Sequence, residues 1–172
     1  MNIVPQPEWL SRARCYYSRI GPDSSDPVTI FAVGENEEAS ETKPGTPVLR
    51  LQPERRFIRV LDSQGHDEGT VHTRVPGVSY VMRRDDIPVW RLSVRSVVRK
   101  RHALSFEDGA KWMFDTPFFW WQHLSGRTAA GPHLLGRVGP RKWLWFFWIE
   151  PGEDTPALLA AVAVQHRNWW HW

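Results

Sequence analysis

The clearest hydrophobic pattern in the chain is an unbroken apolar run near its C-terminal end. Every residue from 157 to 164 is apolar, so a helix here has no polar face and must be enclosed on all sides. Thr155 can cap the first turn with its hydroxyl, and Pro156 suits the first helical position, where its missing N–H would be unpaired in any case. The run is much shorter than the roughly twenty apolar residues that a membrane span needs. The pattern therefore predicts a central helix over 155–172, buried in the core.

Most of the chain before this helix alternates apolar and polar residues with the period of a half-buried strand. In 89–98, for example, Arg91 and Arg95 fall on one face, whereas Trp90 and Leu92 fall on the other. An Asp-Gly pair at 108–109 predicts a tight hairpin between two further strands. The strands expected from these patterns are 14–20, 28–33, 48–52, 57–61, 70–75, 78–82, 89–98, 102–106, 110–114, 118–124, 134–138 and 142–149.

About 10–12 short strands followed by one all-apolar helix favour a closed barrel, because closure removes the exposed strand edges that promote aggregation. The expected fold is therefore mainly β, a closed antiparallel β-barrel around the hydrophobic C-terminal helix. The alternative is a two-sheet sandwich with the helix across one end. A length of 172 residues with 41% hydrophobic residues fits a single domain over 1–172. The acidic, polar stretch 35–47 is expected to be a mobile loop.

Three segments carry a resemblance to a known family: the strand-turn-strand pattern in 57–71, the hairpin 103–109 and the apolar run in 154–164. In these segments the chain resembles the tubby C-terminal-like superfamily, which tubby proteins share with LURP-one-related proteins and phospholipid scramblases. It is most similar to the LURP-one-related branch, from about Val48 onward. The resemblance implies a barrel around a hydrophobic helix, a non-catalytic role and, as in the tubby branch, association with phosphoinositides or membranes. It carries over no binding residue, because the chain has no counterpart of a defined lipid-contact motif.

The charge of the chain points to an anionic partner. The formal net charge is +3 and the isoelectric point is about 9.3, which is mildly basic. Basic residues near an anionic membrane contribute about 1 kcal/mol each to binding, although a run of charge can also serve only to keep a strand end solvated. The predicted lipid- or anion-binding residues are Arg83, Arg84, Arg95, Arg99, Lys100 and Arg101.

The sequence gives little support to catalysis or to metal binding. His166 and His171 are five residues apart, so they do not share a helix face well, and no HExxH motif is present. Cys15 is the only cysteine, which excludes an intrachain disulfide and a cysteine-based zinc site. His123 could act as a base oriented by Asp115, but most larger folds contain such a pair. We therefore predict no catalytic residue, no metal and no cofactor.

Two aromatic runs, 118–121 and 143–148, are apolar on both strand faces. One face can pack on the helix, and the other needs a cover, either from the N-terminal segment, from a second protomer or from a membrane interface. The alternative function is therefore a protein-protein interaction module or homo-oligomeric scaffold. Nucleic acid is disfavoured, because base-stacking platforms present isolated rings among polar residues. The single cysteine and the N-terminal sequence predict a cytoplasmic protein, soluble or peripheral to a membrane.

Overall fold

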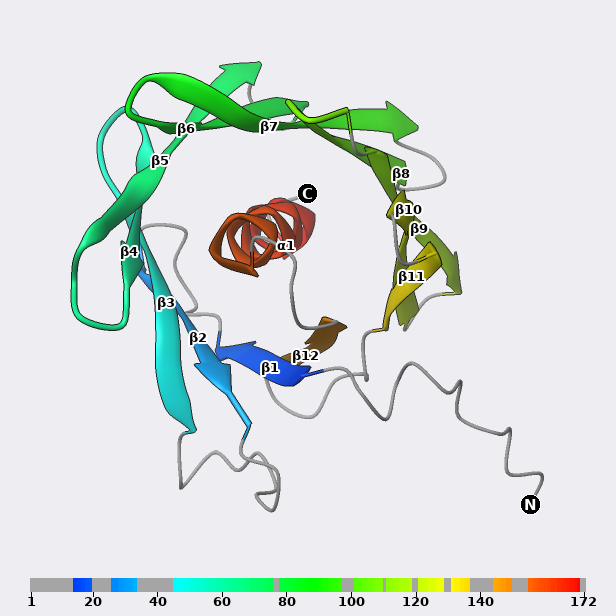
Figure 1. Cartoon of the computed structure of the whole chain (residues 1–172), viewed down its shortest axis with the longest axis horizontal. Helices are drawn as coiled ribbons and strands as arrows, with labels where there is room; N and C mark the ends of the chain where they lie inside the picture. Colours follow the sequence, from blue (N-terminus) through cyan, green and yellow to red (C-terminus); the bar gives the residue numbers. More distant parts are fainter. Residues whose placement is uncertain are drawn as a thin grey trace.

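A computed structural model of the chain describes residues 14–19, 26–33, 45–75, 78–96, 101–109, 111–118, 121–128, 131–136, 144–149 and 155–170. Within these ranges, twelve strands precede a single helix (Figure 1). The elements are β1 (Arg14–Arg19), β2 (Val28–Ala32), β3 (Thr46–Pro53), β4 (Ile58–Asp62), β5 (Asp67–Val75), β6 (Ser79–Arg84), β7 (Ile87–Ser96), β8 (Arg101–Phe106), β9 (Lys111–Phe118), β10 (Trp121–Thr128), β11 (Gly131–Gly136), β12 (Leu144–Ile149) and α1 (Thr155–Trp170).

The strands form one antiparallel sheet with a simple order. From β1 to β11, strands that are consecutive in the sequence are neighbours in the sheet. The exception is β12, which returns to pair with β1, so that Ile149 lies opposite Arg14 and Leu144 opposite Arg19. Figure 1 shows the sheet curling into a ring with α1 in its centre. The prediction of a mainly β chain with one buried helix is confirmed.

The prediction of a closed barrel, in contrast, is wrong. β11 and β12 are the two edges of the sheet, and no hydrogen-bonded ladder joins the described residues of these two strands. Some Cα atoms of β11 and β12 lie within 8 Å of each other, so the edges approach without pairing. The apolar pattern requires only that the inner face and the helix be covered, and a curled open sheet meets that requirement. The two-sheet sandwich is also wrong, because all twelve strands belong to one sheet.

The helix is enclosed by the sheet, as its all-apolar sequence predicts. All residues from Ala157 to Gln165 are buried. Alternate residues of the strands form the surrounding wall, which is why the period-two pattern was visible in the sequence. Trp90 of this wall is fully buried, and its indole Nε1 donates a hydrogen bond to the carbonyl oxygen of Ala157 at 2.9 Å. The start of the helix is thus held against β7 by a specific polar contact as well as by apolar packing.

The predicted loop 35–47 is only partly described. Its last two residues already belong to β3, where Thr46 pairs with Ala32 and Pro47 with Phe31. The N–H of Gly45 donates a hydrogen bond to the hydroxyl oxygen of Tyr17 at 2.7 Å. These contacts fix residues 45–47 against β1 and β2. Residues 35–44 lie outside the described residues.

One glycine in the wall is required by backbone geometry. Gly69 follows a shift in the β4–β5 register, has φ of 137°, and has its N–H bonded to a carboxylate oxygen of Asp67 at 2.8 Å. A Cβ at this position would collide with the backbone carbonyl of Arg83 on the neighbouring strand. Gly65 also has a positive φ, 87°, but a Cβ there would have no atom within 4 Å.

We expect Gly69→Ala to destabilise the protein by about 3 kcal/mol, since the backbone conformation itself costs about 1–3 kcal/mol for a residue with a side chain and the collision adds to it. Gly65→Ala is the matched control, because it carries the conformational cost without the collision. Urea denaturation of the two variants would measure the difference. Equal losses in the free energy of unfolding would show that β5 and β6 move apart at little cost to accommodate the new Cβ.

The helix axis gives the ring two ends. Trp90, near the start of β7, contacts the first turn of α1, so the helix begins at the end that carries the β6–β7 turn. Alternate turns of an antiparallel meander lie at the same end, so the β4–β5 and β8–β9 turns lie there as well. This end is called the acidic rim and is defined by Asp62, Asp67, Glu68, Asp85, Asp86, Glu107 and Asp108. The opposite end, with the β3–β4, β5–β6 and β7–β8 turns, is called the basic rim and is defined by Arg55, Arg56, Arg74, Arg95 and Arg101.

Candidate functional site

The structure separates the six arginines and lysines predicted from the sequence to form one site. Arg83 pairs with Pro88 near the start of β7, whereas Arg95 lies seven residues further along the same strand. At about 3.3 Å per residue, the two backbones are roughly 23 Å apart. Arg83 and Arg84 therefore lie towards the acidic rim, and the six residues do not form one patch. Their closeness in the sequence reflected one strand that runs from end to end of the ring.

Arg84 is engaged within the protein. Its guanidinium lies 3.2 Å from a carboxylate oxygen of Glu68, and its Nε donates to the backbone carbonyl of the same residue. Arg83 is exposed and makes no ion pair with the described residues. Asp85 and Asp86 follow directly, both with positive φ, and form the β6–β7 turn. An anion that approached Arg83 or Arg84 would thus meet two exposed carboxylates.

The remaining predicted residues belong to the other end of the ring. Arg95 is exposed near the end of β7, and Arg101 opens β8, where it pairs with Ser96. Arg99 and Lys100 lie outside the described residues, in the sequence that joins these two strands. The prediction of a basic site in this part of the chain is therefore kept for the β7–β8 end and dropped for the β6–β7 end.

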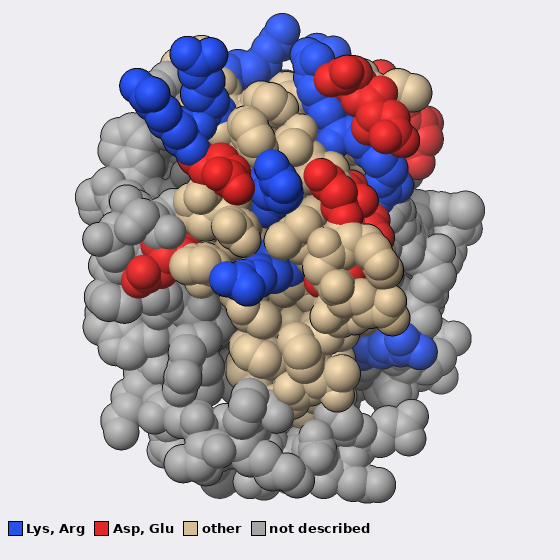
Figure 2. Space-filling view, turned by 90° about the vertical axis from the view of Figure 1, so that its left-hand side faces the viewer, with Lys and Arg blue, Asp and Glu red and all other residues tan. Residues whose placement is uncertain are grey.

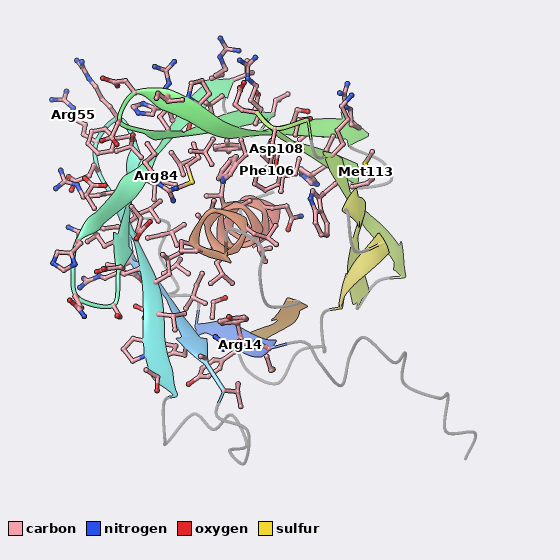
Figure 3. The ribbon with its side chains drawn as sticks, in the orientation of Figure 1. Arg14, Arg55, Arg84, Phe106, Asp108 and Met113 are labelled. Atoms are coloured by element: carbon pink, nitrogen blue, oxygen red, sulfur yellow. The ribbon has the colours of Figure 1, made fainter. Side chains whose placement is uncertain are left out.

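Three arginines that sequence reasoning did not select lie at the same rim. Arg55 and Arg56 are exposed in the β3–β4 turn, and Arg74 is exposed near the end of β5. In Figure 3 the side chain of Arg55 points away from the ring. Like Arg95, none of the three makes an ion pair with any described residue. Their guanidinium groups are thus available to an external anion, and arginine forks suit phosphate and carboxylate groups.

A ring contact holds the β3–β4 turn beside β5. The Phe57 ring, at the end of this turn, has the Arg59 guanidinium carbon 6.0 Å from its centroid. The Phe57 ring also contacts His72 of β5, and the two ring centroids are 5.6 Å apart. His72 Nε2 in turn lies 2.9 Å from the Thr70 hydroxyl. Because the turn is packed against β5 in this way, Arg55 and Arg56 are placed next to the strand that carries Arg74.

Backbone hydrogen bonds extend the rim from β5 to β7. The N–H of Val78 donates to the carbonyl oxygen of Val75 at 3.0 Å, and the N–H of Val94 donates to the carbonyl oxygen of Val78 at 2.8 Å. Arg74 precedes the first of these residues and Arg95 follows the last. The two arginines are therefore separated by about two strand spacings, roughly 10 Å. Four exposed arginines thus follow one another along the rim from the β3–β4 turn to β7.

Acidic residues are concentrated at the opposite end. Among the carboxylates whose side chains the structure describes, only Asp26 and Glu54 lie towards the basic rim. Figure 2 shows most acidic side chains on the right of the face, whereas basic side chains lie at its upper left, in its centre and also on the right among the acidic ones. At the acidic rim, backbone hydrogen bonds from His66 and Gln64 lower the pKa of Asp62.

The other groups considered in the sequence are a histidine–aspartate pair, two aromatic runs, possible metal ligands and the cysteine. His123 and Asp115 are direct backbone partners across β10 and β9, but their side chains lie outside the described part of the structure. The same holds for the side chains of both aromatic runs. The described residues contain no group of three or more histidine, cysteine, aspartate or glutamate residues that could hold a metal ion. Burial raises the pKa of the Cys15 thiol to about 11, so it is protonated at neutral pH.

The fold and the site together define a curled antiparallel β-sheet module with an enclosed helix and with most of its described carboxylates at one end of the ring. Comparison of the chain with protein-family models, with curated proteins and with solved structures finds no match. The similarity to tubby-like proteins therefore stays a prediction.

Proposed function

We propose that the protein is a non-catalytic module that binds an anionic phospholipid surface through the basic rim. The observation that carries the proposal is the basic rim itself, where four exposed arginines make no ion pair with described residues, while most described carboxylates lie at the opposite end of the ring. The resemblance to tubby-like proteins agrees with this role. Within the described residues, no helix has the length and apolar character needed to cross a bilayer.

The magnitude of the expected attraction fits reversible attachment. At about 1 kcal/mol per basic residue, Arg55, Arg56, Arg74 and Arg95 supply about 4 kcal/mol. Arg99, Lys100 and Arg101 can add to this value through the β7–β8 connection. A surface of this kind binds weakly and responds strongly to ionic strength, because salt screens charges over about 10 Å at 0.1 M. The acidic rim disfavours attachment by the opposite end.

Vesicle flotation tests the proposal. The wild-type protein is expected to float with vesicles that contain phosphatidylserine in phosphatidylcholine, and to stay in the lower fraction with phosphatidylcholine alone. Raising the salt concentration from 0.1 M to 1 M should release most of the bound protein, because the Debye length falls to about 3 Å. Binding to neither kind of vesicle would remove the proposal, and equal binding to both would remove the role of charge.

A further inference from the structure

The basic rim also carries an exposed apolar turn. The side chains of Val75 and Val78 are 50% and 41% exposed, and they flank the tip of the β5–β6 turn. The hydrogen bond from the N–H of Val78 to the carbonyl oxygen of Val75 fixes these two residues side by side. Residues 76 and 77 lie outside the described residues. The pair is termed the valine tip.

The setting of the valine tip is cationic. Arg74 directly precedes Val75, and the backbone of Val78 is bonded to Val94, whose neighbour is Arg95. Arg74 and Arg95 are both exposed. Two apolar side chains therefore lie between two arginines at the end of the ring, where the polypeptide turns back towards the sheet.

A second exposed apolar residue provides a contrast. Ile87 is 67% exposed at the acidic rim, directly after Asp85 and Asp86. Its surroundings differ from those of the valine tip, because two exposed carboxylates precede the isoleucine and Arg84, its backbone partner, is ion-paired with Glu68. Of these two exposed apolar sites, the valine tip is thus the one that lies between two arginines without an ion pair to described residues.

We propose that the valine tip inserts into the boundary between headgroups and acyl chains of an anionic bilayer. This inference rests on the proposed function and adds to it the element that enters the membrane. Basic residues would hold the rim at the lipid phosphates while the two valines leave water, and stable attachment to membranes commonly needs such a pair of signals. The occupant is thus a lipid surface that combines negative charge with accessible apolar chains, which charge complementarity favours over a neutral partner.

The test compares Val75→Ser/Val78→Ser with Ile87→Ser on phosphatidylserine-containing vesicles. Removal of the four valine methyl groups should lower the partition coefficient of the double variant by about tenfold or more. The two side chains are 50% and 41% exposed, so insertion takes roughly two methyl groups' worth of surface out of water, and each methyl group contributes roughly fourfold. Ile87→Ser should bind like the wild type. The small amount of wild-type protein that remains bound at 1 M salt should be lost in the double variant. Circular dichroism of both variants checks that the fold is retained.

The outcomes separate this inference from the proposed function. If the wild type binds anionic vesicles and the double valine variant binds equally well at both salt concentrations, insertion is wrong and attachment by charge stands. A reduction that is as large in Ile87→Ser also overturns the inference, since the effect is then not specific to the basic rim. If the wild type binds no anionic vesicle, the proposed function is wrong and the inference falls with it.

Discussion

Replacing Arg55, Arg56, Arg74 and Arg95 together with glutamate is expected to lower partitioning onto anionic vesicles by at least about a thousandfold. Each arginine near the surface contributes about 1 kcal/mol, so loss of four costs about 4 kcal/mol, and every 1.4 kcal/mol is a factor of ten. The new carboxylates add repulsion. All four residues are exposed and make no ion pair with described residues, so the fold should tolerate the change. Flotation or sedimentation with phosphatidylserine vesicles measures the effect.

Arg83→Glu is the matched control for this reversal. Arg83 is equally exposed and equally without an ion pair to described residues, but it lies towards the acidic rim. Its reversal should change partitioning by less than about threefold, since its charge would face away from the bilayer. A single Arg74→Glu variant has the same change in net charge, but its partitioning onto anionic vesicles should fall more than that of Arg83→Glu. Equal losses in the two single variants would mean that net charge, and not the basic rim, controls binding.

Trp90→Ala should destabilise the protein by about 3–5 kcal/mol, which is a large share of the 5–15 kcal/mol typical of a folded domain. Trp90 is fully buried in β7, and its indole both fills the space beside the start of α1 and donates to the Ala157 carbonyl oxygen at 2.9 Å. The substitution removes the ring and the hydrogen bond together. Urea denaturation followed by circular dichroism measures the loss.

Trp90→Phe separates packing from hydrogen bonding. It keeps an aromatic ring and removes the donor, so we expect a loss of about 1–2 kcal/mol, close to the value of one buried hydrogen bond plus a small cavity. Leu104→Ala, at another fully buried position of the wall, gives the cost of a cavity without a polar contact. Faster amide exchange in the second turn of α1, whose N–H groups bond to the carbonyls of the first turn, for the Trp90 variants but not for Leu104→Ala would show that the indole anchors the helix start. A loss below about 1 kcal/mol for Trp90→Ala would contradict this role.

The local elements could be read from the sequence because each one depends on a short-range pattern. The run from Ala157 to Val164 has no polar residue, and burial of the whole segment follows from that fact alone. Alternation in β7 placed Trp90 and Leu92 inside and Arg91 outside, as the structure shows. Closure of the ring could not be read in this way, because it depends on a ladder between β11 and β12 that alternation within either strand does not specify.

The candidate site could be predicted only in part, because closeness in sequence was used in place of position along a strand. Arg83 and Arg95 belong to opposite ends of the ring. A signal for the two rims was nevertheless present in the sequence, since alternate turns of a meander share an end. Carboxylates mark the β4–β5, β6–β7 and β8–β9 turns, whereas arginines mark the β3–β4 turn and the end of β5. The exposure of the two valines in the valine tip depends on how the β5–β6 turn packs, and no pattern in the sequence indicated it.

The central claim is that the basic rim faces the membrane, and the depth of a spectroscopic label tests it most directly. Thr73→Cys and Ser63→Cys place a fluorophore at the exposed basic and acidic ends respectively, while the raised pKa of Cys15 keeps that thiol slow to react at neutral pH. On phosphatidylserine vesicles that contain a brominated lipid, the label at position 73 should be quenched strongly and the label at position 63 should be unaffected. Stronger quenching at position 63, or equal quenching at both, would contradict the account.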